Sequence, residues 1–285
     1  MNNLFIFGYG YTANYFLKII ESDFNNIFVT SREPSKIREN LIAQAVNFSD
    51  TRKILNDSKN NITHILCSIP PDIDGDPAFL KFHEDLKNLS SLRWIGYLSA
   101  TSVYGDHNGE FVDENSELKA KNQRGLNRIL AEEQWLKFCD ENNILLNIFR
   151  IAGIYGPGRN IFERIKNNEY KLIIKPNHFF SRIYITDLIQ CIREAMLRCE
   201  YTEIYNVSDD LPSSIQDVVK YICDKIEINQ PDIISFEKLE NEMTRSFYKD
   251  NKKVNNELIK NRFNLNLKFP TYREGYDEII NKLIN

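Results

Sequence analysis

The chain has 285 residues, of which 42% are hydrophobic and 27% are charged, and its formal net charge is -4. These values are typical of a globular protein with one large domain or two coupled ones. Neither half of the chain is strongly basic, so the sequence does not support a nucleic-acid or membrane partner.

Cysteine and histidine usage argues against structural disulfides and metals. Five cysteines occur, none in C-x-x-C spacing, at positions 67, 139, 191, 199 and 223. An odd number of cysteines makes a poor disulfide framework, so we expect reduced thiols. The four histidines are scattered along the chain, and we expect no structural metal.

The N-terminal sequence MNNLFIFGYG lacks a basic segment, and its apolar run is too short for a signal peptide. No stretch approaches the roughly 18 apolar residues of a membrane helix. We therefore predict a cytoplasmic protein.

The first half of the chain alternates short apolar runs with segments of helical periodicity. Buried strands are predicted at 4–7, 27–30, 62–67, 94–99 and 144–151. Helices are predicted at 13–20, 79–92 and 123–142, with a short helix or turn at 35–41. This rhythm indicates an α/β fold with a doubly wound parallel sheet. The buried stripe of the longest helix is predicted to consist of Leu126, Ile129, Leu130, Leu136 and Phe138.

Beyond Gly158 the pattern is less regular. Helices are predicted at 161–167, from 187 onward and at 214–225. Strands or extended segments are predicted at 171–175, 183–186, 203–207 and 233–236. Because no low-complexity linker separates these segments from the first half, we expect a smaller α/β lobe interwoven with the main sheet.

A glycine-rich turn follows the first predicted strand and precedes the first predicted helix. It reads G-x-G-x-x-A and comprises Gly8, Tyr9, Gly10, Tyr11, Thr12 and Ala13. Gly8 permits a tight turn, Gly10 allows the backbone to approach a pyrophosphate, and Ala13 allows the helix to pack closely. A plain tight turn is the alternative, but this position at the start of a βαβ series favours a dinucleotide site.

The second predicted strand ends at Ser31 and Arg32, roughly twenty residues further on. A site that prefers NAD usually has a carboxylate there to hold the ribose 2′-hydroxyl. A hydroxyl and a guanidinium suit a 2′-phosphate instead. We therefore predict NADP(H) as the preferred cofactor, with NAD(H) possible. The alternative is that Arg32 is a solvated loop residue.

Four further segments carry a family resemblance: YLSATSVYG at 97–105, FRIAGIYGPG at 149–158, IYITD at 183–187 and YNVS at 205–208. In this order the chain resembles the extended short-chain dehydrogenases, the NAD(P)-dependent epimerase/dehydratase family. The G-x-G-x-x-A loop resembles the atypical branch.

The resemblance implies a Rossmann domain at 1–160 and about 182–210. It implies a small substrate-binding lobe at about 161–181 and 211–285. It also implies cofactor contacts from the turn after the third predicted strand and from the segment 149–158, namely Ser68, Ile69, Pro70, Ala152 and Ile154.

The catalytic groups of that family are replaced in this sequence. The family uses a Ser or Thr and a Tyr-x-x-x-Lys, whose tyrosine moves a proton while its lysine holds the nicotinamide ribose. Ala100 stands at the Ser/Thr position. The adjacent Thr101 could substitute only if a bulge or loop turned it round, because neighbours on a strand point to opposite faces.

Counting back from Glu132 places Arg124 at the tyrosine position and Arg128 at the lysine position. An arginine cannot shuttle protons at physiological pH. Arg128 could hold the ribose hydroxyls, and Arg124 could bind an anionic substrate group. The alternative is that both are solvated residues of a surface helix.

Other candidates lie in the resembling segments and beside them. Tyr104 and Tyr155 could replace the lost acid, or could be buried aromatics whose hydroxyls have one partner each. Asp113 and Glu114 could act as an acid or base, but such residues usually lie on solvated loops. Asp187 is predicted to be a helix N-cap.

Two functions follow from these observations. The first is an NADP(H)-dependent oxidoreductase or epimerase/dehydratase acting on a sugar-nucleotide-like or other polar, anionic substrate. The second is a non-catalytic NADP(H)-binding redox sensor, which the replacements at Ala100, Arg124 and Arg128 favour. A homodimer formed through the helix that begins at Gln123 is also possible, since family members often pair through two helices.

Overall fold

A computed structural model describes residues 2–37, 43–57 and 61–284 of the chain. The chain divides into two compact units, each built from three stretches of sequence. Unit 1 comprises Met1–Ala100, Gln123–Arg150 and Ile189–Tyr205, and unit 2 comprises Thr101–Asn122, Ile151–Leu188 and Asn206–Asn285. The domain bounds implied by the family resemblance stay a prediction.

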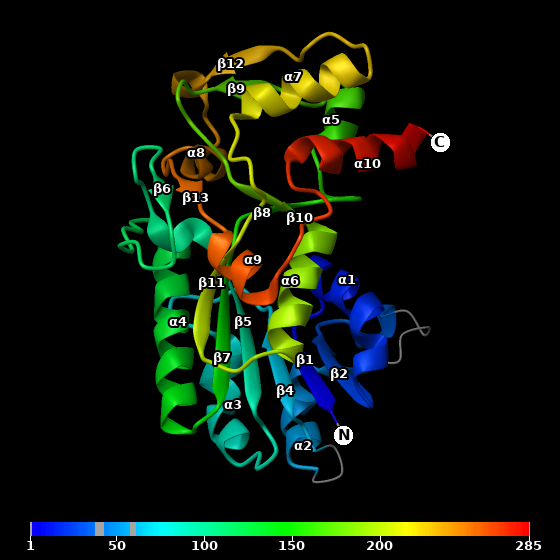
Figure 1. Ribbon diagram of the computed structural model, residues 1–285, viewed down its shortest axis with the longest axis vertical. Coiled ribbons are helices and arrows are strands. Elements are labelled where there is room, and N and C mark those ends of the chain that lie inside the picture. The colour runs from blue at the N-terminus through cyan, green and yellow to red at the C-terminus, as the bar shows by residue number, and fades with distance from the viewer. Residues whose placement is uncertain (1, 38–42, 58–60, 285) are drawn as a thin grey trace. The chain divides into compact units, whose positions relative to one another are not determined.

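Unit 1 is built on a seven-stranded sheet with the strand order β11-β7-β5-β4-β1-β2-β3 (Figure 1). The strands are β1 Asn3–Phe7, β2 Asn26–Ser31, β3 Gln44–Asn47, β4 His64–Cys67, β5 Trp94–Ala100, β7 Leu145–Ile151 and β11 Glu203–Val207. The pairs from β5 to β3 are all parallel. The α/β fold with a parallel sheet, predicted from the sequence, is confirmed.

Helices and turns connect these strands. The helices are α1 Tyr11–Ile20, α2 Thr51–Leu55, α3 Pro77–Lys87, α4 Gln123–Glu141 and α6 Ile185–Leu197. Short 3₁₀ turns occupy Glu21–Asp23, Pro34–Lys36, Phe48–Asp50 and Thr101–Tyr104. On one face of the sheet, strand residues such as Phe7 and Ile95 pack with Phe82 of α3 and Trp135 of α4. Leu4 and Ile6, which alternate with Phe5 and Phe7, are equally buried, so both faces are covered.

The predicted buried stripe of α4 was largely wrong. The buried residues of this helix are Gly125, Ala131, Glu132, Trp135, Phe138 and Cys139. Of the predicted stripe only Phe138 is buried, whereas Leu126 is 44% exposed. The helix buries small residues, two aromatic residues and one ion-paired glutamate, and a count of aliphatic positions cannot detect that choice.

Smaller differences in unit 1 concern element ends and two short elements. The strand predicted at 62–67 begins at His64, and the helix predicted at 79–92 spans Pro77–Lys87. Strand β3 and helix α2 were not predicted, because four and five residues are too few for a periodic signal. Of the segment predicted at 35–41, residues 38–41 lie outside the described residues.

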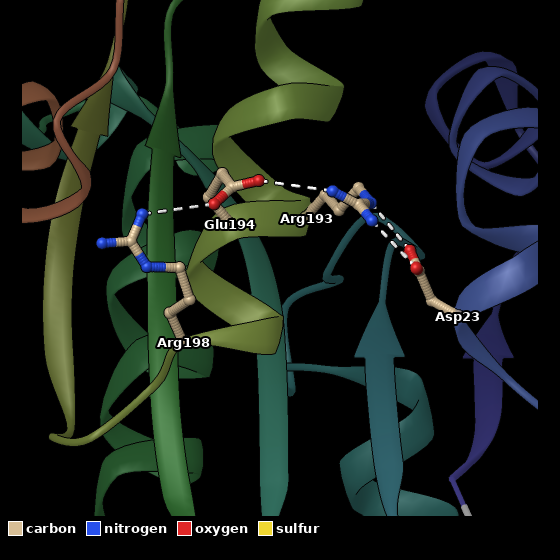
Figure 2. A network of polar contacts seen from close by, with 4 residues as sticks. All are labelled: Asp23, Arg193, Glu194 and Arg198. Carbon is tan, nitrogen blue, oxygen red and sulfur yellow. Dashed lines mark hydrogen bonds and ion pairs between the residues drawn. The ribbon is translucent and has the colours of Figure 1, made fainter.

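An ion-pair network fixes the second half of α6 within unit 1 (Figure 2). Arg193 meets Asp23 with two hydrogen bonds of 2.7 and 2.8 Å. Glu194 contacts both Arg193 and Arg198 at 3.3 Å. The network therefore attaches α6 to the 3₁₀ turn that follows α1.

Unit 2 contains three short parallel strand pairs and several helices. The pairs are β8 Gly153–Tyr155 with β10 Arg182–Tyr184, β9 Leu172–Ile174 with β12 Ile233–Ser235, and β6 Phe111–Val112 with β13 Lys253–Val254. The helices are α5 Phe162–Lys166, α7 Ile215–Lys225, α8 Glu242–Phe247, α9 Glu257–Phe263 and α10 Tyr272–Ile284, and a 3₁₀ turn lies at Phe236–Lys238. The elements predicted at 161–167, 171–175, 214–225 and 233–236 are confirmed.

Asp187 is not the N-cap that the sequence suggested. It is the third residue of α6 and is buried. Its carboxylate accepts hydrogen bonds from the backbone N–H groups of Lys268 and Phe269, at 3.0 and 2.8 Å. The carboxylate therefore fixes the loop at Lys268 and Phe269, and it does not cap the N-terminus of α6.

Among the described residues, no helix is long and apolar enough to cross a membrane. No three His, Cys, Asp or Glu side chains in this part of the chain are grouped as a metal ion would require. The five cysteines all lie within the described ranges, and none forms a disulfide.

Candidate functional site

The turn after β1 has the geometry of a phosphate loop. Gly8 has φ +97°, which L side chains rarely adopt, and a Cβ there would lie 2.9 Å from Cγ1 of Ile69. The Gly8 N–H donates to Oγ1 of Thr30, at 2.8 Å. The Ser68 hydroxyl donates to the Gly8 carbonyl, also at 2.8 Å. Side chains at the ends of β2 and β4 therefore fix the turn from both sides.

The helix start beyond this turn suits an anion. A Cβ on Gly10 would meet no described atom within 4 Å, so the backbone is open to a ligand there. Gly10 has no side-chain cap, and the first turn of α1 contains no acidic residue. The partial positive charge of the helix N-terminus is therefore not offset by a carboxylate of that turn. Ala13 is fully buried, as close packing of α1 requires.

A cavity of about 950 Å³ opens beside this turn within unit 1. Residues after β1, β2, β3 and β4 line it, and ligands of doubly wound sheets bind at this carboxyl edge. The lining residues are Gly8, Tyr9, Gly10, Thr30, Ser31, Arg32, Glu33, Ile37, Phe48, Ser68, Ile69, Pro70 and Pro77. The structure thus brings together the predicted glycine turn, strand-two end and Ser68–Pro70 turn. Tyr11 and Thr12 follow as the first residues of α1.

One basic and one acidic residue, Arg32 and Glu33, directly follow β2. Arg32 and Glu33 are exposed and both line the cavity. The Glu33 N–H donates to the Ser31 hydroxyl at 3.1 Å, which holds the two residues in a compact bend. The preference for NADP(H) stays a prediction.

Sequence reasoning missed several lining residues, including Thr30, Phe48 and Pro77. Thr30 is a buried polar residue at the end of an apolar strand, and that contrast was an available signal. Phe48 directly follows β3, so recognition of β3 would have placed it at the carboxyl edge. Pro77 begins α3 and has no distinctive signal.

The region around the end of β5 contains a buried polar network. Glu132 of α4 and Arg150 of β7 form an ion pair at 2.8 Å, and both side chains are at most 4% exposed. The Ser99 hydroxyl of β5 donates to the same carboxylate. Glu132, used as the anchor for counting, therefore joins α4 to two neighbouring strands.

The two arginines at the family's Tyr and Lys positions differ in environment. Arg128 is half-buried, and its guanidinium donates to the carbonyl of Leu98 near the end of β5. Arg124 is exposed, one turn earlier on α4. Arg128 thus has a fixed guanidinium, whereas Arg124 presents its side chain at the helix surface.

In unit 2, Thr101 and Tyr104 begin and end a 3₁₀ turn. Because β5 ends at Ala100, strand alternation no longer decides where Thr101 points, and it is half-buried. Tyr104 is fully buried, and its hydroxyl donates to Oδ1 of Asn206 at 2.7 Å. Glu114 also serves this segment, since its carboxylate accepts from the Asn206 N–H at 2.7 Å.

Tyr155 is enclosed in unit 2. Its ring is 5% exposed, and its hydroxyl lies 3.4 Å from the Thr271 carbonyl. A Cβ on Gly275 would lie 2.0 Å from this hydroxyl, so α10 closes over it. Burial raises the pKa of Tyr155 well above its ordinary value. Nearby, the Ala152 N–H donates to the Val207 carbonyl, and Ile154 is half-buried in β8.

Asp209 is a titratable group that sequence reasoning did not single out. It is 1% exposed, and burial raises its pKa from 3.8 to about 8, although nearby Arg182 opposes the shift. Shifts of this size gather at functional sites but also occur in structural networks. In the sequence nothing distinguishes it from its exposed neighbour Asp210.

Comparison with known proteins identifies a related solved structure. No family model and no curated protein matches the sequence. A solved structure of a functionally unknown conserved protein from Silicibacter pomeroyi is 36% identical, with 99% of each chain covered and a TM-score of 0.91. The chain belongs to the family of that protein.

More distant structures show the same fold. A dTDP-glucose 4,6-dehydratase from Bacillus anthracis in complex with NAD is 15% identical, covers 99% of this chain and 96% of its own, and has a TM-score of 0.80. A UDP-glucuronic acid 4-epimerase from Bacillus cereus in complex with NAD is 14% identical, covers 99% and 100%, and has a TM-score of 0.73. The structural neighbours are therefore members of the NAD-dependent epimerase/dehydratase family, the extended short-chain dehydrogenases.

Proposed function

We propose that the chain binds NADP(H) in the unit 1 cavity and acts as an oxidoreductase or epimerase/dehydratase on a sugar-nucleotide-like or other polar, anionic substrate. The observation that carries this proposal is the cavity itself. It combines a positive-φ glycine turn, a helix N-terminus without acidic residues and a wall from the ends of β2 and β4. Its volume of about 950 Å³ suits a ligand of dinucleotide size.

In this proposal each part of the cavity has one task. The first turn of α1 holds the pyrophosphate through backbone N–H groups. Ser31 and Arg32 hold the 2′-phosphate, for which a guanidinium gives charge-assisted hydrogen bonds. Ser68, Ile69 and Pro70 form the opposite wall. When bound, the cofactor supplies hydride transfer at the nicotinamide ring.

The chain must manage the proton without a Tyr-x-x-x-Lys. Arg128 keeps donors beyond the one used for Leu98 and would hold ribose hydroxyls. The exposed Arg124 would attract an anionic substrate group. Thr101 is our candidate for the hydroxyl that contacts the reacting oxygen. Tyr104 and Tyr155 are weaker candidates, because both hydroxyls face protein atoms.

A second candidate function is a non-catalytic NADP(H) sensor. The enclosed hydroxyls of Tyr104 and Tyr155 favour it, together with the replacements at Ala100, Arg124 and Arg128. In that case the cavity would bind the cofactor and the chain would report its redox state to a partner.

Fluorescence titration with NADPH and separately with NADH tests the cofactor part of the proposal. We expect tight NADPH binding and weak NADH binding. If neither binds, the cofactor assignment is wrong. If NADPH binds, incubation with a panel of sugar nucleotides distinguishes the two functions: cofactor oxidation or reduction supports the enzyme, and its absence across the panel favours the sensor.

We also propose that two copies pair through α3 and α4. Leu80 on α3 and Leu126 on α4 are 43% and 44% exposed, and the two helices are neighbours in unit 1. Light scattering after size exclusion tests this pairing, and a wild-type monomer at high concentration would contradict it.

A further inference from the structure

We propose that Gln134 of α4 is a positioning residue for the cofactor cavity. Its side-chain amide holds a turn that joins two parts of the cavity wall, so that the wall keeps the shape that a dinucleotide needs. This inference rests on the proposed NADP(H) site.

The turn lies between Pro70 and Pro77, both of which line the cavity. Asp72 and Gly75 close it with two backbone hydrogen bonds, of 2.9 and 3.2 Å. Gly75 has φ +116°, a conformation that L side chains rarely adopt. These bonds set the internal shape of the turn, but they do not attach it to the rest of unit 1.

Gln134 supplies that attachment. Its Nε2 donates to the Asp74 carbonyl at 2.9 Å, and its Oε1 accepts from the Asp76 N–H at 3.0 Å. The amide lies directly against Gly75, where a Cβ would come within 2.0 Å of Oε1. One amide group therefore bridges two backbone groups on either side of a glycine that has no side chain to displace it.

The held segment continues into the start of α3. Asp76 is fully buried, and its Oδ1 caps α3 by accepting from the N–H groups of Ala78 and Phe79, at 2.8 and 2.9 Å. The Phe79 and Trp135 rings pack edge to face, with their centroids 5.2 Å apart. Two adjacent residues of α4 thus contact this segment. Gln134 accepts from the Asp76 N–H, and Trp135 packs against Phe79 in the first turn of α3.

Pro77 follows Asp76 directly and is the first residue of α3. Its place in the cavity wall is therefore set by the segment that Gln134 holds. Because α4 packs against β5, the Gln134 amide holds the turn, and with it this part of the cavity wall, at a fixed position relative to the sheet. Without it, the turn would keep its internal hydrogen bonds but lose its fixed distance from the sheet.

The test is the Gln134→Ala variant, with Glu133→Ala as matched control. Both change one residue of the same helix to alanine, and Glu133 is exposed. We expect the Kd for NADPH to rise about five- to tenfold in Gln134→Ala, the effect of losing one or two net hydrogen bonds. The control should stay within about twofold of wild type. Amide hydrogen exchange in residues 70–80 of the cofactor-free protein should be faster in Gln134→Ala only.

Two further variants separate positioning from general stability. Gln134→Glu keeps the acceptor for the Asp76 N–H but, when ionised, replaces the donor to Asp74 with an oxygen that repels the Asp74 carbonyl, so its Kd should be at least as high as that of Gln134→Ala. Gly75→Ala should raise the Kd strongly in the wild-type chain and less in the Gln134→Ala chain, because the clash with the amide is then removed.

An unchanged Kd in Gln134→Ala overturns the inference, even if urea unfolding shows a loss of stability. An equal rise in Glu133→Ala overturns it as well. If the wild-type chain binds neither NADPH nor NADH, the proposed function fails and this inference fails with it. The two failures are distinguishable, because failure of this inference alone would leave wild type and Gln134→Ala binding NADPH equally well.

Discussion

The cavity at the carboxyl edge of β1, β2 and β4 differs in construction from the region where β5 meets α4. The first surrounds an open cavity with the glycine turn and the strand ends beside it, and the backbone at Gly10 is open to a ligand. The second is filled by polar side chains that bind one another, with Ser99, Glu132 and Arg150 in one buried network. A phosphate site depends on backbone N–H groups and needs few side-chain identities. A catalytic site needs particular acids and bases in place.

The difference explains how the geometry predicted for a dinucleotide can occur in a chain that has Arg124 and Arg128 where the resembling family has Tyr and Lys. Arg128 contacts the Leu98 carbonyl and so contributes to the structure of the β5–α4 region. Buried ion pairs such as Glu132–Arg150 add little net stability, but they are costly to break. The region therefore has a fixed polar interior whatever chemistry it performs.

The largest effect is expected from breaking that interior with Glu132→Ala. The change removes the carboxylate that neutralises the buried Arg150 guanidinium and accepts from Ser99. We expect the free energy of unfolding in urea to fall by about 3–5 kcal/mol. Glu133→Ala, at an exposed neighbour, should change it by less than about 0.5 kcal/mol. Equal losses in the two variants would show that the network is not the cause.

The second largest effect is expected from a substitution in the cavity of unit 1. Gly10→Asp places a carboxylate in the open space where the pyrophosphate is expected. We expect NADPH affinity to fall by about a hundredfold or more, about 2.7 kcal/mol, with little change in unfolding free energy because no described atom lies within 4 Å of the new Cβ. NADPH affinity equal to wild type, measured by fluorescence titration, would refute the phosphate-loop assignment.

The sequence predicted the cavity better than the β5–α4 region, for a physical reason. The G-x-G-x-x-A pattern dictates backbone geometry locally, so Gly8 and Gly10 could be assigned from neighbours alone. Ser68, Ile69 and Pro70 were predicted from the family resemblance, and they lie at the same edge of the sheet because neighbouring parallel strands end there. Phe48 was missed because β3 is only four residues long.

Side-chain partners across the fold could not be predicted in this way. Nothing in the sequence pairs Glu132 with Arg150, or Asp187 with the backbone of Lys268 and Phe269. The clamp of Gln134 on the turn before α3 is likewise a contact between segments about 60 residues apart. Periodicity identifies elements, whereas the choice of buried polar partner depends on how the elements pack.

Unit 2 contains a buried acid of its own, Asp209, and Thr101 and Tyr155 lie in the same unit. The pKa of Asp209 is raised to about 8, mainly by burial, with Arg182, Asp210, Asp187 and the Leu211 N–H as its electrostatic neighbours. A raised folded-state pKa gives stability that is fully present below about pH 4 and is lost as pH rises to about 8.

Asp209→Asn removes this titration. Relative to wild type, the variant should gain stability steadily as the pH rises through that window, as measured by urea unfolding at several pH values. Asp232→Asn, at an exposed position of the same unit, is the control. Parallel pH profiles for wild type and Asp209→Asn would mean that the carboxyl titrates normally.

A smaller effect is expected at the strand-two end of the cavity. Arg32→Asp replaces a guanidinium that would hold a 2′-phosphate with a carboxylate that repels it and suits a ribose 2′-hydroxyl. We expect NADPH affinity to fall about tenfold, which is about 1.4 kcal/mol, and the preference to shift toward NADH. Glu33→Gln changes the adjacent charge and should leave NADPH binding intact or slightly stronger. A variant that still prefers NADPH would place the 2′-phosphate elsewhere.

The smallest effect separates stability from binding within unit 1. Arg193 holds Asp23 with two hydrogen bonds (Figure 2). Neither residue lines the cavity. Arg193→Lys keeps the charge but loses the bidentate geometry, so the unfolding free energy should fall by about 1 kcal/mol or less. Arg198→Lys, at the more exposed end of the same network, should cost about 0.3 kcal/mol.

Both of these lysine variants should bind NADPH with wild-type affinity, because the network acts on α6 and the turn after α1 without touching the ligand walls. A change in Kd that follows the loss of stability in Arg193→Lys would show that the cavity depends on the whole of unit 1. In that case the weaker binding expected of Gln134→Ala could no longer be ascribed to its grip on Asp74 and Asp76.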